Sequence, residues 1–301
     1  MALSTNKQVR HYWLPVLQAT ACDDLFSELH GDNATAEDIL EFMNFSKSNP
    51  DSIRNCIALA RENARMARDK ISVEMWLELN LLYLFTRSDE ARELCEQSPT
   101  DFYERIIQSS LLFQGITDAT IPHGEGWEFI QLGKILERAD KTSRILDIPN
   151  HCPSTENAVH WAAILRSCSA QAAYRQFYGG QATMDKTAEL LLFSQSFPRS
   201  ARFCVKLMDE LLHQISGVAP GQYSNEAERL TGSLLAHLNF SSMTDVKKQG
   251  LHFYVDDLQS QLNDIGQQIF ESYVLLPKEV AELAASNTPP LWVQQAQQNQ
   301  Q

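Results

Sequence analysis

The feature that most constrains the fold of this 301-residue chain is an internal repeat. When the sequence is aligned with itself at an offset of 148, 13 of the 44 positions from Trp13 to Cys56 are identical without a gap. Unrelated segments of average composition would match at roughly one position in fifteen to twenty. The identities resume near Phe102 at an offset of 151, so the loops of the two copies differ by only a few residues. The first-copy residues that are repeated are Trp13, Leu17, Gly31, Ala34, Thr35, Glu41, Phe45, Ser46, Ser48, Pro50, Ser52, Arg54 and Cys56.

Each copy predicts several helices. Glycine (12) and proline (11) are scarce, and apolar residues recur at three- and four-residue steps, as on one face of a helix. The repeated prolines Pro50 and Pro198 are expected in the first turn of a helix, the first one capped by Ser48 or Asn49. We therefore predict an all-α helical bundle built from two tandem pseudo-symmetric repeats that share one core.

The expected organisation has three parts. Residues 1–120 form the first helical repeat, residues 121–283 form the second, and residues 284–301 form a flexible Gln-rich tail. Within the tail, the apolar segment 291–293 is a candidate for docking on a partner or packing back on its own domain.

Composition excludes several classes of function. A formal net charge of −13 predicts that the protein repels nucleic acids and anionic membrane surfaces. No apolar run reaches the roughly 20 residues that span a bilayer, and we expect no secretory signal. The six cysteines form no Cys-x-x-Cys pair, so we predict reduced, buried thiols in a cytoplasmic protein.

Three arginines form the first candidate site. Arg61, Arg65 and Arg68 lie on one face of a predicted helix, and three like charges on one stripe need acidic neighbours. Ion pairs with neighbouring helices would satisfy them. Alternatively, their guanidinium groups would bind a carboxylate or phosphate of a ligand.

A second polar helix is predicted over residues 125–147. Glu137 can pair with Lys141, and Asp140 with Arg144, both across one helical turn. Arg138 is expected to point between helices, where it would need a carboxylate partner. It is a candidate for anion binding, as is Arg144, or for a structural ion pair that fixes helix register.

Familiar catalytic motifs are weak or missing. One Glu-x-x-His pattern ends at His213, whereas a di-iron bundle needs two such patterns and further glutamates. The sequence contains no Gly-x-x-x-x-Gly-Lys-Ser/Thr, His-Glu-x-x-His or Gly-x-Ser-x-Gly pattern. We therefore predict no metal site and no cofactor, and the residues alone name no reaction.

The segment 125–147 resembles the signature of the alpha-E domain family, a bacterial helical group named for a Glu-Arg pair, here Glu137-Arg138. Glu125, Trp127 and Asp140 belong to this signature. Further segments resemble the family at residues 60–65, 71–76, 197–200 and 250–252. The resemblance implies partners of the ATP-grasp-like ligase and transglutaminase-like classes, and a role in making or modifying a peptide or amide.

The resemblance also implies a Glu-Arg helix at the start of the first repeat. At an offset of 148, the counterpart of Glu137 would precede Met1, so the sequence lacks that helix. Either the true start lies upstream, or a partner or symmetry mate in a homo-oligomer supplies the helix.

Two functional hypotheses follow. The first is an accessory or scaffold subunit that works with an ATP-grasp-type ligase. The alternative is a free-standing enzyme with its site between the repeats. In that enzyme the Arg61–Arg68 row would bind substrate carboxylates, and Glu62 or Glu137 would be a base with a raised pKa. Purely structural assembly is the third hypothesis.

Overall fold

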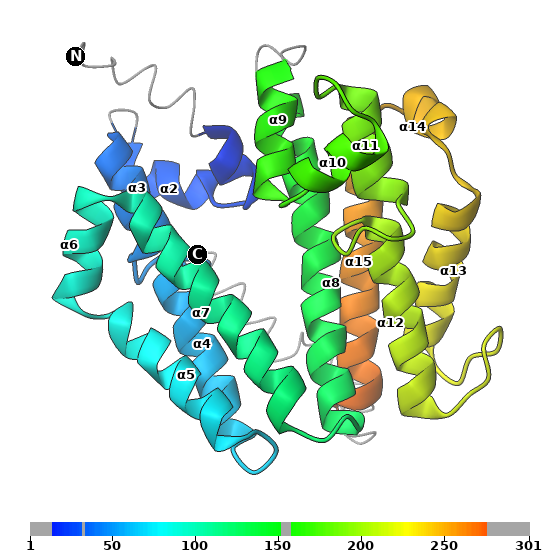
Figure 1. The fold of residues 1–301 in the computed structure, drawn as a ribbon, viewed down its shortest axis with the longest axis horizontal. Coiled ribbons are helices and arrows are strands. Elements are labelled where there is room, and N and C mark those ends of the chain that lie inside the picture. The colour runs from blue at the N-terminus through cyan, green and yellow to red at the C-terminus, as the bar shows by residue number, and fades with distance from the viewer. Residues whose placement is uncertain (1–13, 32–33, 152–157, 276–301) are drawn as a thin grey trace. The chain divides into compact units, whose positions relative to one another are not determined.

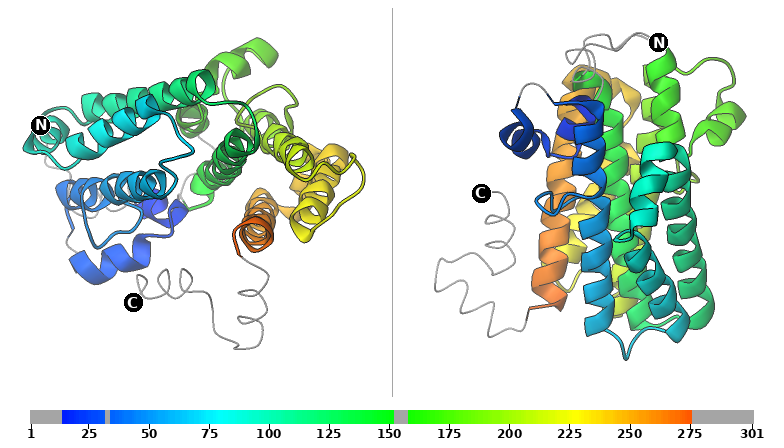
Figure 2. Two further views of the ribbon diagram at one scale, coloured as in Figure 1. Left: turned by 90° about the horizontal axis from the view of Figure 1, so that it is seen from below. Right: turned by 90° about the vertical axis from the view of Figure 1, so that its left-hand side faces the viewer.

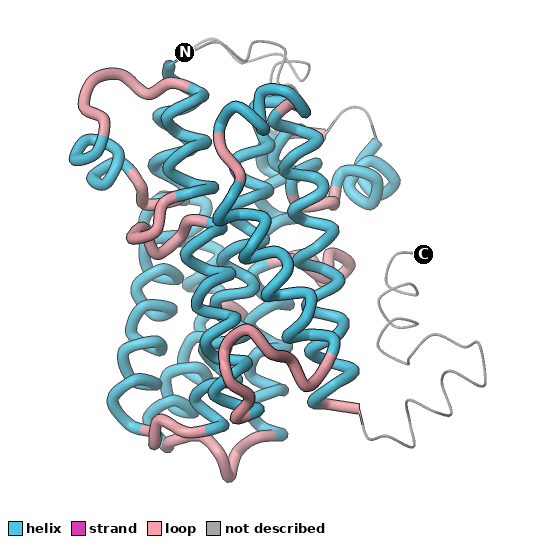
Figure 3. Tube along the Cα trace, turned by 90° about the vertical axis from the view of Figure 1, so that its right-hand side faces the viewer, coloured by secondary structure: helices cyan, strands magenta, loops and turns pink. Residues whose placement is uncertain are grey.

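The computed structural model describes residues 14–31, 34–151 and 158–275, and all secondary structure within these ranges is helical (Figures 1 and 3). The predicted all-α class is therefore confirmed. The chain divides into two compact units, unit 1 up to Trp127 and unit 2 from Glu128 onward. Within the described ranges, no helix is long and apolar enough to span a bilayer.

Unit 1 is built around three helices that run side by side. After a helical segment over residues 14–19, its helices are α2 (Asp23–His30), α3 (Ala36–Asn44), α4 (Ile53–Met66), α5 (Val73–Phe85), α6 (Asp89–Gln97) and α7 (Pro99–Thr120). Helix α5 packs against both α4 and α7, and α6 packs against α7 (Figure 2). One apolar cluster lies at α2 and α3, and a second joins Phe45, Phe85, Ala91, Cys95 and Phe102.

Unit 2 contains most of α8 (Glu125–Asp147) and all later helices. These are the 3-10 turn η2 (Ile148–His151), α9 (Ala158–Ser167), α10 (Gln171–Phe177), α11 (Met184–Phe193), α12 (Ala201–Ser216), α13 (Glu226–Phe240), α14 (Met243–Gln249) and α15 (Leu251–Tyr273). Helix α13 packs against α12 and α15, as α5 packs against α4 and α7. The deepest side chains are Leu132, Ile135, Leu146, Leu190, Leu191, Leu192, Met208 and Leu212.

The start of α4 corrects the expected helix boundary. Pro50 lies in a turn, and the N-cap is Ser52 rather than Ser48 or Asn49. The buried Ser52 hydroxyl donates to the carbonyl of Ser46 (2.8 Å) and accepts from the backbone N–H of Asn55 (3.3 Å). This cap satisfies an N–H that has no partner inside the helix, which explains why the helix begins at residue 53.

The same cap recurs in unit 2. Pro198 again lies in the turn, and Ser200 caps α12. Its hydroxyl donates to the carbonyl of Ser194 (2.5 Å) and accepts from the N–H of Phe203 (3.1 Å). The two serines lie 148 positions apart, the offset at which the sequence repeats.

Two further pairs at this offset share unusual backbone geometry. Ala21 and Ser169 have φ angles of 54° and 53°, in the left-handed region that residues other than glycine rarely adopt. Gly31 and Gly179 have φ angles of 63° and 60°. The repeated glycines thus stand where the chain needs positive φ, which a side chain would disfavour.

For the last helices of the two units, α7 and α15, the offset seen in the structure differs by one residue from the offset in the sequence alignment. Phe45 packs against Phe102 with ring centroids 5.4 Å apart, and its counterpart Phe193 packs against Tyr254 at 6.0 Å. Phe102 and Tyr254 lie 152 positions apart, as do the first residues of α7 and α15. An offset of 151 therefore aligns identical residue types, whereas an offset of 152 aligns the residues that occupy the same place in the packing.

The cysteines only partly follow the prediction of buried thiols. Cys22, Cys95, Cys168 and Cys204 are buried, whereas Cys56 is exposed. That prediction is wrong for Cys56, which lies on a face of α4 where Leu59 and Ala60 are also exposed. Cys152 and the predicted tail, with its segment 291–293, lie outside the described residues.

Candidate functional site

Of the predicted arginine row, Arg61 and Arg65 lie on α4, whereas the helix ends at Met66 and Arg68 lies in the turn that follows, so the prediction of one helix face is wrong for Arg68. The three side chains have different partners. Arg61 donates through Nε to Asn80 Oδ1 (2.7 Å), and its guanidinium lies over the rings of Trp76 (5.1 Å) and Tyr83 (4.5 Å). Arg68, in the turn after α4, also lies over the ring of Trp76, at 5.6 Å. Aromatic faces attract guanidinium groups, so α5 stabilises these two charges without a carboxylate.

The third arginine is paired within its own helix. Arg65 Nε donates to Glu62 Oε2 (2.9 Å), and both side chains are half exposed. This hydrogen bond lowers the pKa of Glu62 below its usual value. The raised pKa expected of a catalytic base is therefore wrong for Glu62. Binding of a ligand carboxylate or phosphate by this row stays a prediction.

On α8, both predicted ion pairs are confirmed. Lys141 Nζ lies 3.2 Å from Glu137 Oε1, and Arg144 Nε donates to Asp140 Oδ2 at 2.8 Å. The Asp140 side chain is only 12% exposed, and its Oδ1 atom is buried with no hydrogen-bond partner among the residues that the structure describes. Asp140 thus anchors two cations, since Lys141 also lies 3.3 Å from its Oδ2 atom.

Arg138 points toward the start of α12. Its Nη1 atom lies 3.5 Å from the carbonyl oxygen of Pro198. Burial and the neighbouring charge of Arg199 lower the pKa of Arg138 from its usual value. Leu136 packs against α15, where the position of a Cβ on Gly266 would be 3.3 Å from Leu136 Cδ2. The side chain of Arg138 thus reaches the turn before α12, and its role in anion binding or in a structural ion pair stays a prediction.

The first turn of α8 is tied to the end of α7. Trp127 Nε1 donates to Asp118 Oδ1 (2.9 Å), and its indole stacks on His123 with ring centroids 4.4 Å apart. Glu125 is the first residue of α8 and is exposed. Trp127 therefore links the two helices at this connection.

The last residue of α8 forms a pair that the sequence analysis did not predict. Asp147 is 10% exposed, and His252 Nδ1 lies 3.0 Å and 3.1 Å from its two carboxylate oxygens. Asn150 also donates to Asp147 Oδ1, at 2.6 Å. The signal was present, because Asp147 and His252 both lie in segments that resemble the family, but sequence does not show that segments 105 residues apart meet.

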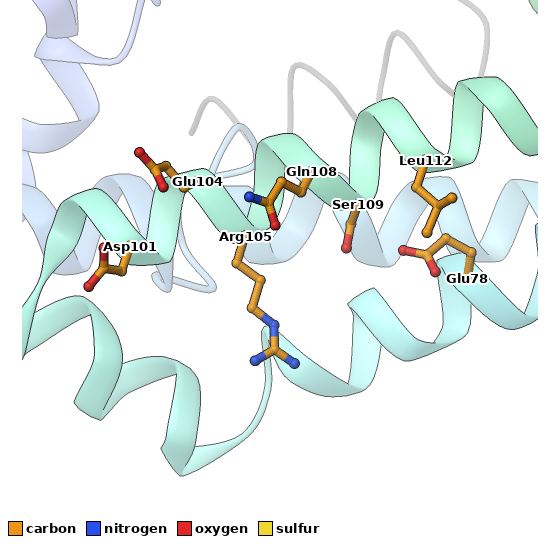
Figure 4. A pocket seen from close by; sticks show the side chains of 7 residues that line it. All are labelled: Glu78, Asp101, Glu104, Arg105, Gln108, Ser109 and Leu112. Carbon is orange, nitrogen blue, oxygen red and sulfur yellow. The ribbon is translucent and has the colours of Figure 1, made fainter.

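A groove of about 620 Å³ lies between α5 and α7 (Figure 4). Glu78 projects into it from α5, and the other lining residues project from α7. The lining residues are Glu78, Asp101, Glu104, Arg105, Gln108, Ser109 and Leu112. Arg105 is engaged by Glu90 (2.9 Å), so the groove presents mainly negative charge.

The described residues contain no group of three or more His, Cys, Asp or Glu side chains placed to hold a metal ion. What the geometry offers is therefore an acidic groove, two arginines stacked on aromatic rings and the His252–Asp147 pair.

Comparison with known proteins identifies the class to which this chain belongs. The model of the Alpha-E family, described as a predicted alpha-helical domain with a conserved ER motif, matches residues 1–274. The chain belongs to the Alpha-E family, and Glu137-Arg138 lies on α8.

Curated relatives include uncharacterized proteins of Mycobacterium bovis and Mycobacterium tuberculosis. Both are 22% identical over 244 residues, which cover 76% of this chain and 26% of each relative. The chain thus spans about a quarter of the length of the relatives it matches. No solved structure matches it.

Proposed function

We propose that this Alpha-E chain is an accessory subunit that docks through unit 1 on an ATP-grasp-type ligase of a peptide- or amide-forming system. The carrying observation is an apolar row on the outer face of α5. We name Val73, Leu77, Leu81 and Leu84 the α5 stripe; they are 56%, 53%, 61% and 55% exposed. Four such side chains at helical spacing are typical of an interaction surface.

The chemistry next to the α5 stripe defines the partner surface. On α7, Ile107, Leu111 and Leu112 are also more than half exposed, and the acidic groove lies between the two helices. A matching surface would carry apolar side chains flanked by lysine or arginine, because like charges across an interface oppose binding. Charge complementarity therefore favours a basic amphipathic partner element.

The relatives support a role within a larger assembly. A match to about a quarter of their length means that in those proteins the helical module is joined to much more polypeptide. The ligase class comes from the family resemblance, which associates such modules with ATP-grasp-like ligases. A transglutaminase-like protein is the other partner class that this resemblance suggests.

The chain itself we propose to be two tandem pseudo-symmetric repeats. The matched serine caps, the positive φ angles and the corresponding aromatic contacts support this proposal.

The test uses the double variant Leu77→Glu/Leu81→Glu. The control, Gln214→Glu/Asn263→Glu, adds the same charge at exposed positions of α12 and α15. Tagged wild-type protein is purified from its host, a co-purifying ATP-grasp ligase is identified by mass spectrometry, and the affinity of each variant for purified ligase is measured. We expect the stripe variant to bind at least about tenfold more weakly and the control to bind like wild type.

Equal binding by both variants would overturn the proposal, as would recovery of no ligase from cells that express one. Self-association of the wild type that the stripe variant abolishes would assign the surface to a homo-oligomer instead.

The His252–Asp147 pair favours a second candidate, an enzyme acting on a carboxylate- or peptide-containing substrate. A mostly buried carboxylate beside one imidazole nitrogen orients the ring, as the carboxylate of a Ser-His-Asp triad orients its general base. His252→Gln would then abolish turnover by the purified chain without changing its melting temperature. Unchanged turnover would eliminate this candidate.

A further inference from the structure

A cavity of about 350 Å³ opens in unit 2 between α12, α13 and the loop that joins them. Asp209 and His213 line it from α12, and Gly232 and Ala236 line it from α13. Pockets for small ligands begin at roughly 300 Å³, so an amino-acid-sized molecule can enter.

The corresponding place in unit 1 is filled. Counted from the N-caps of α5 and α13, Ala236 corresponds to Tyr83, whose ring packs against Arg61. At the offset of 148, Arg61 itself corresponds to Asp209. Under the proposed repeat, unit 2 has therefore lost the ring and exchanged the guanidinium for a carboxylate.

Asp209 is the charged residue of the cavity whose carboxylate can still accept hydrogen bonds from a ligand. Its side chain is 20% exposed, and among the described residues no donor hydrogen-bonds its carboxylate. The closest cationic group is His213, with Nδ1 3.8 Å from Asp209 Oδ1. Burial raises the pKa of Asp209, so a bound cation would relieve an unfavourable charge.

The other charged groups that face the cavity are already engaged. Glu228 accepts from Ser224 N (2.6 Å) and from Asn225 Nδ2 (3.1 Å). Arg229 Nε donates to Glu226 Oε2 at 2.7 Å. These contacts hold the ends of the loop and of α13 and leave Asp209 to meet a ligand.

The rim carries two exposed aromatic rings. Tyr223 is 61% exposed and Phe240 is 89% exposed, and both line the cavity. The cavity therefore has a carboxylate and aromatic rings in its lining, and both kinds of group bind guanidinium groups, through charge-assisted hydrogen bonds and cation–π attraction respectively.

From this cavity, its unfilled carboxylate and the filled counterpart in unit 1, we propose that unit 2 binds an arginine-type guanidinium group, either free or on a peptide. The site is independent of the docking surface on α5, so either proposal can fail without the other.

The test measures binding of N-acetyl-arginine amide to the full chain by calorimetry near neutral pH. N-acetyl-citrulline amide, which has the same shape but no charge, is the ligand control. Asp209→Asn removes the carboxylate, and Ala236→Tyr fills the cavity with the side chain that unit 1 has. Glu210→Gln is the matched control, because it removes one negative charge from an exposed neighbouring position on α12.

We expect the arginine compound to bind and the citrulline compound to bind at least about tenfold more weakly. Asp209→Asn and Ala236→Tyr should each weaken arginine binding by a similar factor, while Glu210→Gln should not. The proposal is overturned by absence of binding at millimolar ligand, by equal binding of the two compounds, or by equal affinity of Asp209→Asn and Glu210→Gln. Because Ala236 is exposed, its variant keeps the test valid even if Asp209→Asn fails to fold.

Discussion

The α4–α5 pair of unit 1 and the α12–α13 pair of unit 2 have the same framework but opposite interior chemistry. Each pair begins with a buried serine cap, and its second helix packs against a third. Where Arg61 stacks on Trp76 and Tyr83 in unit 1, unit 2 has Asp209 beside an open cavity. The comparison shows that backbone-determining residues are shared while interior polar residues are free to diverge.

The contacts made by the third helix of each set, α7 in unit 1 and α15 in unit 2, differ in the opposite way: here unit 1 has the open space. Between α5 and α7 lies a groove of about 620 Å³, whereas the corresponding contact of α13 with α15 leaves no space for a water molecule. Leu234 and Leu258 close that contact and are 1% and 3% exposed. In unit 1 the contact between α4 and α5 is filled by aromatic side chains and that between α5 and α7 contains a groove. In unit 2 the contact between α12 and α13 contains a cavity and that between α13 and α15 is closed.

The largest expected effect concerns the aromatic contact that both units share. Phe102 is fully buried against Phe45 and Phe85, and Tyr254 takes the same place against Phe193. Truncation to alanine at either position should lower the free energy of unfolding by about 3–5 kcal/mol, because it leaves a cavity. Denaturant unfolding followed by circular dichroism measures it. A loss below about 1 kcal/mol at one position would show that the two contacts are not equivalent.

The serine caps come next. Ser52→Ala and Ser200→Ala each remove a donor to a carbonyl, of Ser46 and Ser194 respectively, and an acceptor for a helix N–H. Each variant should cost about 1–2 kcal/mol, and the two costs should be similar. The exposed Ser48→Ala is the control and should change stability by less than about 0.5 kcal/mol. Unequal costs at the two caps would weaken the proposed repeat.

The stability of unit 2 is expected to depend on pH through His213. His213 has both ring nitrogens near carbonyl oxygens, of Asp209 (2.7 Å) and Gln222 (3.1 Å), so it satisfies both only as imidazolium. Burial alone would lower its pKa, but these hydrogen bonds and the nearby carboxylates of Asp209 and Glu228 outweigh burial and raise it above 6.5. Since the folded-state pKa is the higher one, the stabilisation is complete below pH 6.5 and is lost as pH rises through the raised pKa.

Comparison of wild type with His213→Gln measures this contribution. We expect wild type to be more stable by about 1 kcal/mol at pH 5.5, with the difference shrinking at alkaline pH. His237→Gln, at an exposed histidine on α13, should show no such trend. A stability difference that grows with pH would contradict the assigned hydrogen bonds.

The smallest expected effect is a gain in stability. Ala21 and Ser169 hold positive φ angles that cost a side chain energy, so Ala21→Gly and Ser169→Gly should each stabilise by up to about 1 kcal/mol. Ala60→Gly, within α4, should instead destabilise by roughly 1 kcal/mol. Melting temperatures measure all three. Destabilisation by both glycine variants would show that these residues do not adopt left-handed geometry.

Local chemistry explains which predictions were accurate. The helix over 125–147 was predicted within a few residues, because its ion pairs across one turn and its flanking glycine and proline act within a few positions. The start of α4 was predicted wrongly from Pro50, because proline is common both in turns and in the first turn of a helix. Only the fold showed that Ser52 reaches the carbonyl of Ser46.

The sequence by itself determined the helical class and the offset of 148, because periodicity and repetition are properties of neighbouring residues. The tertiary structure decided which faces are covered, and hence that Arg61 stacks on α5 and that Asp147 meets His252. It also decided that Gly232 and Ala236 leave a cavity beside Asp209. Packing joins residues that are far apart in the chain, and a short sequence pattern carries no information on which helix will lie opposite.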